Sequence, residues 1–203
     1  GSIGGVYMQV LLSLFIGYAA LYIVIYLHEV GHAIWYCRFG CKKNWYHVTV
    51  KPYLFFSTPL PVDINQADNL STKKDIIVSY GGILNNFIFT FIAYFLICRF
   101  HIMNYYLSLF LWMFYTLHIA EIVSYMFLGN LYLVSDMKSI AKRQPLLRWV
   151  NLFIGIVLTL GYIWVLTTIP QELFIYILIY NLLTIVCMGL GRIIFTIKHN
   201  KIS

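Results

Sequence analysis

The sequence predicts an all-α membrane protein that crosses the bilayer about five times, with a small strand-like hairpin on its cytoplasmic side. Three observations lead to this prediction. Of the 203 residues 61% are hydrophobic and only 10% are charged, whereas soluble domains have about 45–50% apolar and about 25% charged residues. The apolar residues form long stretches, and the net charge of +7 comes from basic loop residues, so we expect no nucleic-acid partner.

Five apolar stretches are long enough to cross a membrane, since a transmembrane helix needs about 20 mainly apolar residues. The first stretch contains polar residues toward its C-terminal end, which is unusual for a membrane span. We expect the whole chain, 1–203, to form one domain. The predicted spans are residues 6–38, 76–97, 105–128, 150–169 and 173–197.

The basic residues predict the orientation of the chain. Of the 14 Lys and Arg residues, all except Arg99 lie at or after the end of the first, third or fifth predicted span. Cytoplasmic loops collect Lys and Arg. We therefore expect a multi-pass protein of the cell membrane with its N-terminus outside and its C-terminus in the cytoplasm.

One long polar segment, about residues 40–74, separates the first two spans. Within it, residues 45–56 are rich in aromatic and β-branched side chains, which favour strands. Pro52 interrupts this run and is confined to a turn or a strand edge. The pattern predicts a short hairpin or a strand pair at the membrane surface.

The most informative motif is His28-Glu29-Val30-Gly31-His32, in the lower part of the first span. Two histidines four apart project from one face of a helix and can bind one metal ion, while Glu29 lies beside that ion, where it can take a proton from bound water. A charge inside a membrane helix costs at least about 2.5–3.5 kcal/mol. The alternative is a buried His–Glu network that only holds helices together.

Together with two later segments, this motif resembles the site-2 protease family of intramembrane zinc metalloproteases. The second segment is Gly81-Gly82-Ile83-Leu84-Asn85-Asn86, which is similar to the family's Gly-x-x-x-Asn segment. The third is Asn130-Leu131-Tyr132-Leu133-Val134-Ser135-Asp136, similar to the segment that carries the third zinc ligand. The resemblance covers about residues 17–140 and is to a bacterial member without an accessory domain.

The resemblance implies that Zn²⁺ is the cofactor and that His28, His32 and Asp136 are its ligands. The third segment departs from the family pattern, because Leu133 stands at the usual proline position and the spacing before the aspartate is short. Asp136 could instead cap a helix over residues 137–143. The other candidates for a third ligand are Glu121, Asp63, Asp68 and Asp75.

The second segment offers Asn85 or Asn86 to bind the substrate backbone or the oxyanion of the reaction. We favour Asn85, which matches the family position, as a catalytic residue. An equally good alternative is a packing contact in which small residues and an amide hold two helices together.

A second group of polar residues lies in the predicted third and fifth spans. His118 and Glu121 are three residues apart on one helix face, and Arg192 lies at a similar depth. A Glu121–Arg192 ion pair would keep both charges in the bilayer. We expect this pair to be structural, with a gate contact as the functional alternative.

These features predict a zinc metalloendopeptidase that cleaves a membrane-associated protein or small peptide precursor near the cytoplasmic leaflet. Its partners are then a membrane-associated polypeptide and the lipid bilayer. A non-catalytic metal-binding membrane protein would share His28 and His32 but would not need Glu29. A small transporter would spread ionisable residues along a pathway, whereas here they gather near one side of the membrane.

Overall fold

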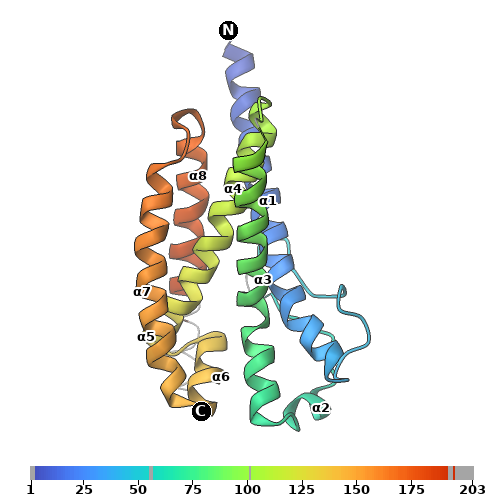
Figure 1. The fold of residues 1–203 in the computed structure, drawn as a ribbon. Coiled ribbons are helices and arrows are strands. Elements are labelled where there is room, and N and C mark those ends of the chain that lie inside the picture. Colours follow the sequence, from blue (N-terminus) through green and yellow to red (C-terminus); the bar gives the residue numbers. More distant parts are fainter. Residues whose placement is uncertain (1–2, 55–56, 101, 192–193, 195–203) are drawn as a thin grey trace.

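The computed structural model describes residues 3–54, 57–100, 102–191 and 194, and this part of the chain is helical without a sheet (Figure 1). Within it, four helical stretches are long and apolar enough to cross a membrane. This confirms the predicted all-α membrane fold. The four are α1 (Ile3–Arg38), α3 (Thr72–Arg99), α4 (Tyr105–Val123) with its continuation to Tyr132, and α7 (Pro145–Thr167).

The described part of a fifth apolar helix lies where the sequence predicts the fifth span. It consists of α8 (Gln171–Leu183) followed by the π-helical segment η2 (Thr184–Leu190). The apolar helical stretch recognised there is Gln171–Cys187, below the length of the four long spans. The predicted span 173–197 extends beyond the described residues. The predicted Glu121–Arg192 pair is not tested, because Arg192 lies outside the described residues.

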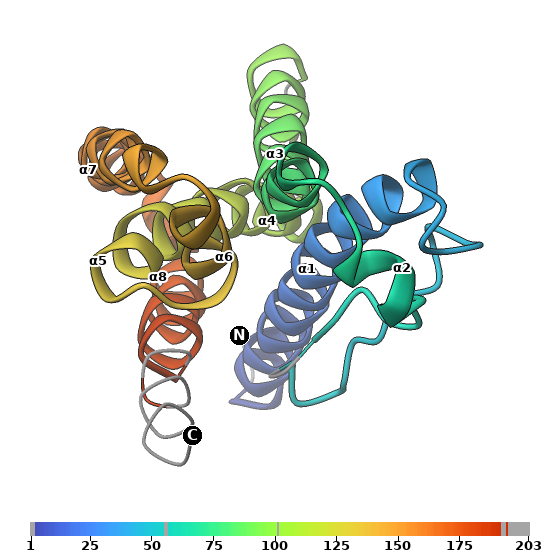
Figure 2. The same cartoon turned by 90° about the horizontal axis from the view of Figure 1, so that it is seen from below.

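Helix α4 forms the centre of the bundle. Its sequence is apolar on all sides, as expected for a helix that is covered all round, and Leu109, Met113 and Leu117 are fully buried. It contacts α1 and α3 on one side and α7 and α8 on the other (Figure 2). Below Val123 it continues as the π-helical segment η1 (Ser124–Gly129) and the single turn α5 (Asn130–Tyr132).

Helices α1 and α3 pack against each other over the lower half of α1, where Gly31 faces Gly81. Small residues at such a crossing let two membrane helices approach to backbone contact. This contact matters for the site, because the histidine motif lies on the same part of α1.

The short helices α2 (Ile64–Asp68) and α6 (Ser135–Arg143) lie at the end of the bundle opposite the N-terminus of α1 (Figure 1). Helix α6 is amphipathic and buries Met137 and Ile140. Its last residue, Arg143, pairs through Nε with Oδ2 of Asp75 on α3, at 2.8 Å. Helix α6 is thus held against the start of α3.

The predicted hairpin over residues 45–56 is not found. In the described part of this segment there is a single antiparallel bridge, between Thr49 and Thr58, in place of a ladder of strand hydrogen bonds. Pro52, Pro59 and Pro61 explain the difference, because proline has no N–H to donate and interrupts strand pairing. Residues 55 and 56 lie outside the described residues.

Candidate metal centre

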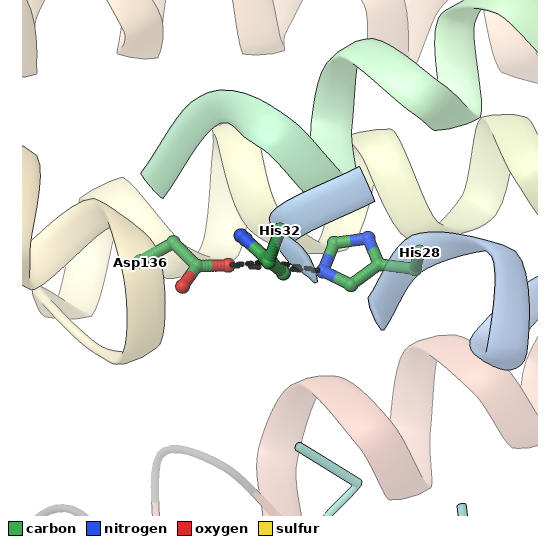
Figure 3. A group of neighbouring side chains, drawn as sticks. All are labelled: His28, His32 and Asp136. Atoms are coloured by element: carbon green, nitrogen blue, oxygen red, sulfur yellow. Dashed lines mark hydrogen bonds and ion pairs between the residues drawn. The ribbon is translucent and has the colours of Figure 1, made fainter. Parts of the chain in front are cut away.

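His28 and His32 project from the same face of α1, one turn apart, as their spacing predicts. Their Nε2 atoms lie 3.1 Å apart. Both side chains are buried, with 2% and 6% of their surfaces exposed. Figure 3 shows that the two rings and the carboxylate of Asp136 point toward one another.

Asp136 reaches the histidines through an unusual turn between α5 and α6. Leu133 and Ser135 adopt left-handed conformations, with φ of 52° and 53°, and Val134 between them is extended. The N–H of Val134 donates to the carbonyl of Gly129 at 3.0 Å. Left-handed residues other than glycine are uncommon and often occur at functional sites. This tight turn accommodates the short spacing before Asp136.

Met137, the residue after the aspartate, fixes this turn in place. Its side chain is fully buried, and the amide of Asn130 donates to its Sδ at 3.1 Å. The Asn130 amide also donates to the carbonyl of Met126 at 2.8 Å. The backbone that carries Asp136 is therefore held in place by the packing of Met137 and the hydrogen bonds of Asn130.

The three donor atoms have the spacing that a tetrahedral metal ion requires. Oδ2 of Asp136 lies 3.7 Å from Nε2 of His28 and 3.4 Å from Nε2 of His32. Ligands held about 2.0–2.1 Å from one tetrahedral Zn²⁺ lie about 3.3 Å from each other. Two imidazole nitrogens and one carboxylate oxygen are also a donor set that catalytic zinc accepts, so the residues fit the ion.

The charge state of Asp136 suits a ligand role. Burial alone raises the pKa of its carboxyl, but the neighbouring His32 and His28 outweigh this effect and hold the pKa below its usual range. The carboxylate is therefore ionised and can act as an electron-pair donor.

Neighbouring helices orient both imidazoles. Nδ1 of His32 lies 2.7 Å from the carbonyl oxygen of Val78 on α3, so Nδ1–H donates there and leaves the Nε2 lone pair for a metal. The ring of His28 stacks on Tyr125, with centroids 4.6 Å apart and planes 8° from parallel. Tyr125 belongs to η1, and π-helical segments frequently occur at functional sites.

Gly82 on α3 lies directly against the rings of His28 and His32. A Cβ at this position would lie 2.5 Å from Nε2 of His28 and 2.6 Å from Nε2 of His32. Any side chain here would occupy the space in front of the two nitrogen atoms. The absence of a side chain at Gly82 keeps that space available to an ion.

Glu29 follows His28 on α1 and is buried, with 7% of its surface exposed. Its carboxylate is near enough to His32 for a Coulombic interaction. A carboxylate in this position can accept a proton from water bound beside the two histidines.

The structure places the two asparagines of the second segment differently. The amide of Asn85, the predicted catalytic residue, donates to the backbone carbonyl of Leu27 on α1. The amide of Asn86 instead contacts His28, with Nδ2 3.0 Å from Nδ1 of the ring. Asn85, which matches the family position, is therefore not the asparagine that contacts a candidate ligand. The Gly-x-x-x-Asn spacing from Gly82, which ends at Asn86, is the signal that could have identified the second residue.

The other acidic candidates for a third ligand have different places. Among the described residues, His28, His32 and Asp136 form the one group whose three ligand atoms lie within 4.8 Å of one another. Asp136 does not cap α6, since Val134 occupies the N-cap position. Of the alternatives, Asp63 caps α2, Asp68 is exposed, Asp75 pairs with Arg143, and Glu121 is buried on α4.

The fold and the motif together define a class of protein. Four long apolar helices make this a multi-pass membrane protein, and two histidines four apart on a helix with an intervening glutamate are the pattern of metallopeptidases. The chain belongs to peptidase family M50, the site-2 protease family, whose family model matches residues 16–199. No curated protein and no solved structure gave a match to the chain.

Proposed function

We propose that the protein is an intramembrane zinc endopeptidase that cleaves a membrane-associated protein or small peptide precursor near the cytoplasmic leaflet. One observation carries this proposal: the Nε2 atoms of His28 and His32 and a carboxylate oxygen of Asp136 lie 3.1–3.7 Å apart beside Glu29. Membership of peptidase family M50 supports the reaction class. We treat residues 1–203 as a single protease domain.

His28, His32 and Asp136 would hold Zn²⁺, which leaves a fourth position for water or substrate. When bound, the ion supplies Lewis-acid polarisation of the scissile carbonyl and lowers the pKa of its water toward about 7. The protein's own contribution is to hold the three donors rigidly within a largely apolar bundle, where little water competes for them.

Glu29 would act as the general base and then as the general acid. Its carboxylate takes a proton from the attacking water and passes it to the nitrogen of the leaving amine. Asn85 remains our candidate for binding the substrate backbone or the oxyanion. One of its two N–H groups goes to Leu27, and we assign the second to the substrate.

The position of the site favours cleavage near the cytoplasmic leaflet. The candidate ligands lie in the lower part of α1, toward the end of the bundle where α2 and α6 are found (Figure 1). Arg38 at the end of α1 and the basic residues of α6 lie at the same end. Since cytoplasmic loops collect Lys and Arg, we place this end and the C-terminus inside the cell and the N-terminus outside.

The decisive experiment measures hydrolysis by the purified protein in detergent micelles. The probe is a set of labelled peptides of about 30 residues, each containing one apolar span of about 20 residues. We expect cleavage that a metal chelator abolishes and added Zn²⁺ restores. Glu29→Gln should bind zinc as the parent does but cleave nothing, because an amide cannot accept the proton.

Each alternative function has its own outcome in this experiment. Zinc binding without cleavage by parent or variant would replace the protease with a metal-binding membrane protein. Cleavage that survives in Glu29→Gln would remove Glu29 from the mechanism. Absence of zinc binding by the parent protein would overturn the whole proposal.

A further inference from the structure

Asn86 connects the candidate ligand His28 to a second buried histidine. Its Nδ2 lies 3.0 Å from Nδ1 of His28, and its Oδ1 lies 3.0 Å from Nδ1 of His118 on α4. Asn86 and His118 are both fully buried. The proposed reaction uses neither of them, so this polar connection between three helices needs its own explanation.

His118 is held in a fixed position by aromatic rings. It stacks on Phe89 of α3, with centroids 5.6 Å apart, and meets Phe114 of α4 edge to face at 4.4 Å. Its Nε2 has no hydrogen-bond partner among the described residues. Asn86 is therefore the one hydrogen-bond partner of this ring among the described residues, and the bond is made through Nδ1.

The orientation of the Asn86 amide determines where the protons of both rings reside. An amide nitrogen only donates and an amide oxygen only accepts. When Nδ2 faces His28, Nδ1 of that ring must accept, and its proton then resides on Nε2. That nitrogen is the one that faces His32 and Asp136.

A half-turn of the amide exchanges its oxygen and nitrogen at the same two contacts. Nδ1–H of His28 then donates to Oδ1, and Nδ2–H donates to Nδ1 of His118. Only this orientation leaves the Nε2 lone pair of His28 for a metal ion. Each ring carries one proton before and after the exchange, on its other nitrogen, so the net number of protons does not change.

We propose that Asn86 and His118 are positioning residues that set the tautomer of His28. In the metal-binding form the Asn86 oxygen accepts from His28, and His118 accepts from the Asn86 amide and carries its own proton on Nε2. His118 thereby gives the Asn86 amide a hydrogen-bond partner in the orientation that a metal requires. This inference rests on the proposed metal site but adds two residues that do not touch the ion.

The sequence around Asn86 contains two overlapping Gly-x-x-x-Asn pairs, and the two pairs have different contacts. Gly81 and Asn85 contact the backbone of α1. Gly82 and Asn86, one position later, contact the imidazole of His28. One pair packs the helices, and the other faces the ligands.

The first test compares zinc affinities, measured by competition with a chromogenic chelator. We expect Asn86→Leu to weaken binding by about 10–100-fold, the usual cost of losing a partner that orients a ligand. Asn86→Asp should bind zinc nearly as tightly as the parent, because a carboxylate accepts from His28 in either orientation. A purely structural role predicts that both variants lose affinity equally.

Asn181→Leu is the matched control for this comparison. Asn181 is an equally buried amide on α8 that bonds to Tyr162 and Thr116, away from the ligands. Its replacement should lower stability without changing zinc affinity. If Asn86→Leu binds zinc as tightly as Asn181→Leu does, the inference is wrong.

His118→Phe tests the role of His118 without changing Asn85 or Asn86. The variant removes one unpartnered buried nitrogen, which favours folding, but it also leaves the Asn86 amide without its second partner, which opposes folding. Because these effects offset each other, thermal stability should change little. Zinc affinity should still fall severalfold, because the Asn86 amide then has no second partner to hold it beside His28. Unchanged zinc affinity in His118→Phe would overturn the role of His118.

A direct measurement covers the case in which Asn86→Leu does not fold. In zinc-loaded parent protein with ¹⁵N-labelled histidine, NMR should show His28 protonated at Nδ1 and His118 protonated at Nε2. The His118 signals are those lost in His118→Phe. A His118 protonated at Nδ1 would refute the proposal, whereas a parent that binds no zinc would instead refute the proposed function.

Discussion

Gly31 of α1 and Gly81 of α3 face each other so closely that neither position has room for a side chain. A Cβ on either residue would overlap the backbone carbonyl of the other. The histidine motif and the Gly-x-x-x-Asn segment therefore meet backbone to backbone, and this contact sets the distance between α1 and the ligand-orienting residues on α3.

A methyl group at either glycine should force the two helices apart. We expect Gly31→Ala and Gly81→Ala to lower stability by at least about 1–3 kcal/mol, the usual cost of overpacking, and to weaken zinc binding as well. Thermal unfolding in detergent measures the first effect. Gly161→Ala on α7 is the control, since a Cβ there meets nothing within 4 Å. Equal stability of all three variants would contradict this packing.

Gly82→Ala should separate metal binding from folding. The added methyl would contact the side chains of His28 and His32, not a backbone, and side chains can rotate away. We therefore expect a folded protein with little zinc, measured by metal analysis and by thermal unfolding with chelator present. A Gly82→Ala protein that holds as much zinc as the parent would show that the ion does not lie in front of these rings.

Asp136→Ala should lose zinc affinity by more than the roughly 10–100-fold cost of losing a partner of a ligand, because it removes a bond to the ion. Asp68→Ala is the matched control, since Asp68 is exposed. Asp75 is a poor control, because it pairs with Arg143 on the helix that carries Asp136. If Glu121→Ala loses zinc and Asp136→Ala keeps it, the third ligand lies on α4.

Cysteine labelling of intact cells tests the orientation of the chain. In a background without native thiols, Met103→Cys, almost fully exposed between α3 and α4, should react with an impermeant reagent from outside. Asn44→Cys, in the long polar loop, should react only after the membrane is opened. The reverse pattern would invert the topology that the basic residues predict.

The helices and the two histidines could be predicted from the sequence because both depend on local information. Apolar stretches of about 20 residues identify spans, and a spacing of four puts His28 and His32 on one helix face. Asp136 could be named only through the family resemblance. The position of Asp136 beside the histidines depends on the left-handed conformations of Leu133 and Ser135. Neither residue is a glycine, so the sequence does not indicate these conformations.

The choice between Asn85 and Asn86 could not be made from the sequence. Both end a Gly-x-x-x-Asn pair, and the rotation of α3 about its axis decides which one faces His28. That rotation is set by the contact between Gly31 and Gly81, which is a tertiary interaction. The described part of residues 45–56 has a single bridge in place of a hairpin for a local reason, because prolines interrupt strand pairing in a segment whose aromatic and β-branched content favours strands.

Two candidate ligands stand on α1, whereas Asp136 follows only after three apolar helical stretches. A nascent or misassembled chain that carries the complete His28–His32 motif still lacks a full set of donors. Chemical competence would thus arise only after α6 has been made and has docked against the start of α3. The fold would in this way keep an incompletely inserted protease inert within the membrane it shares with other proteins.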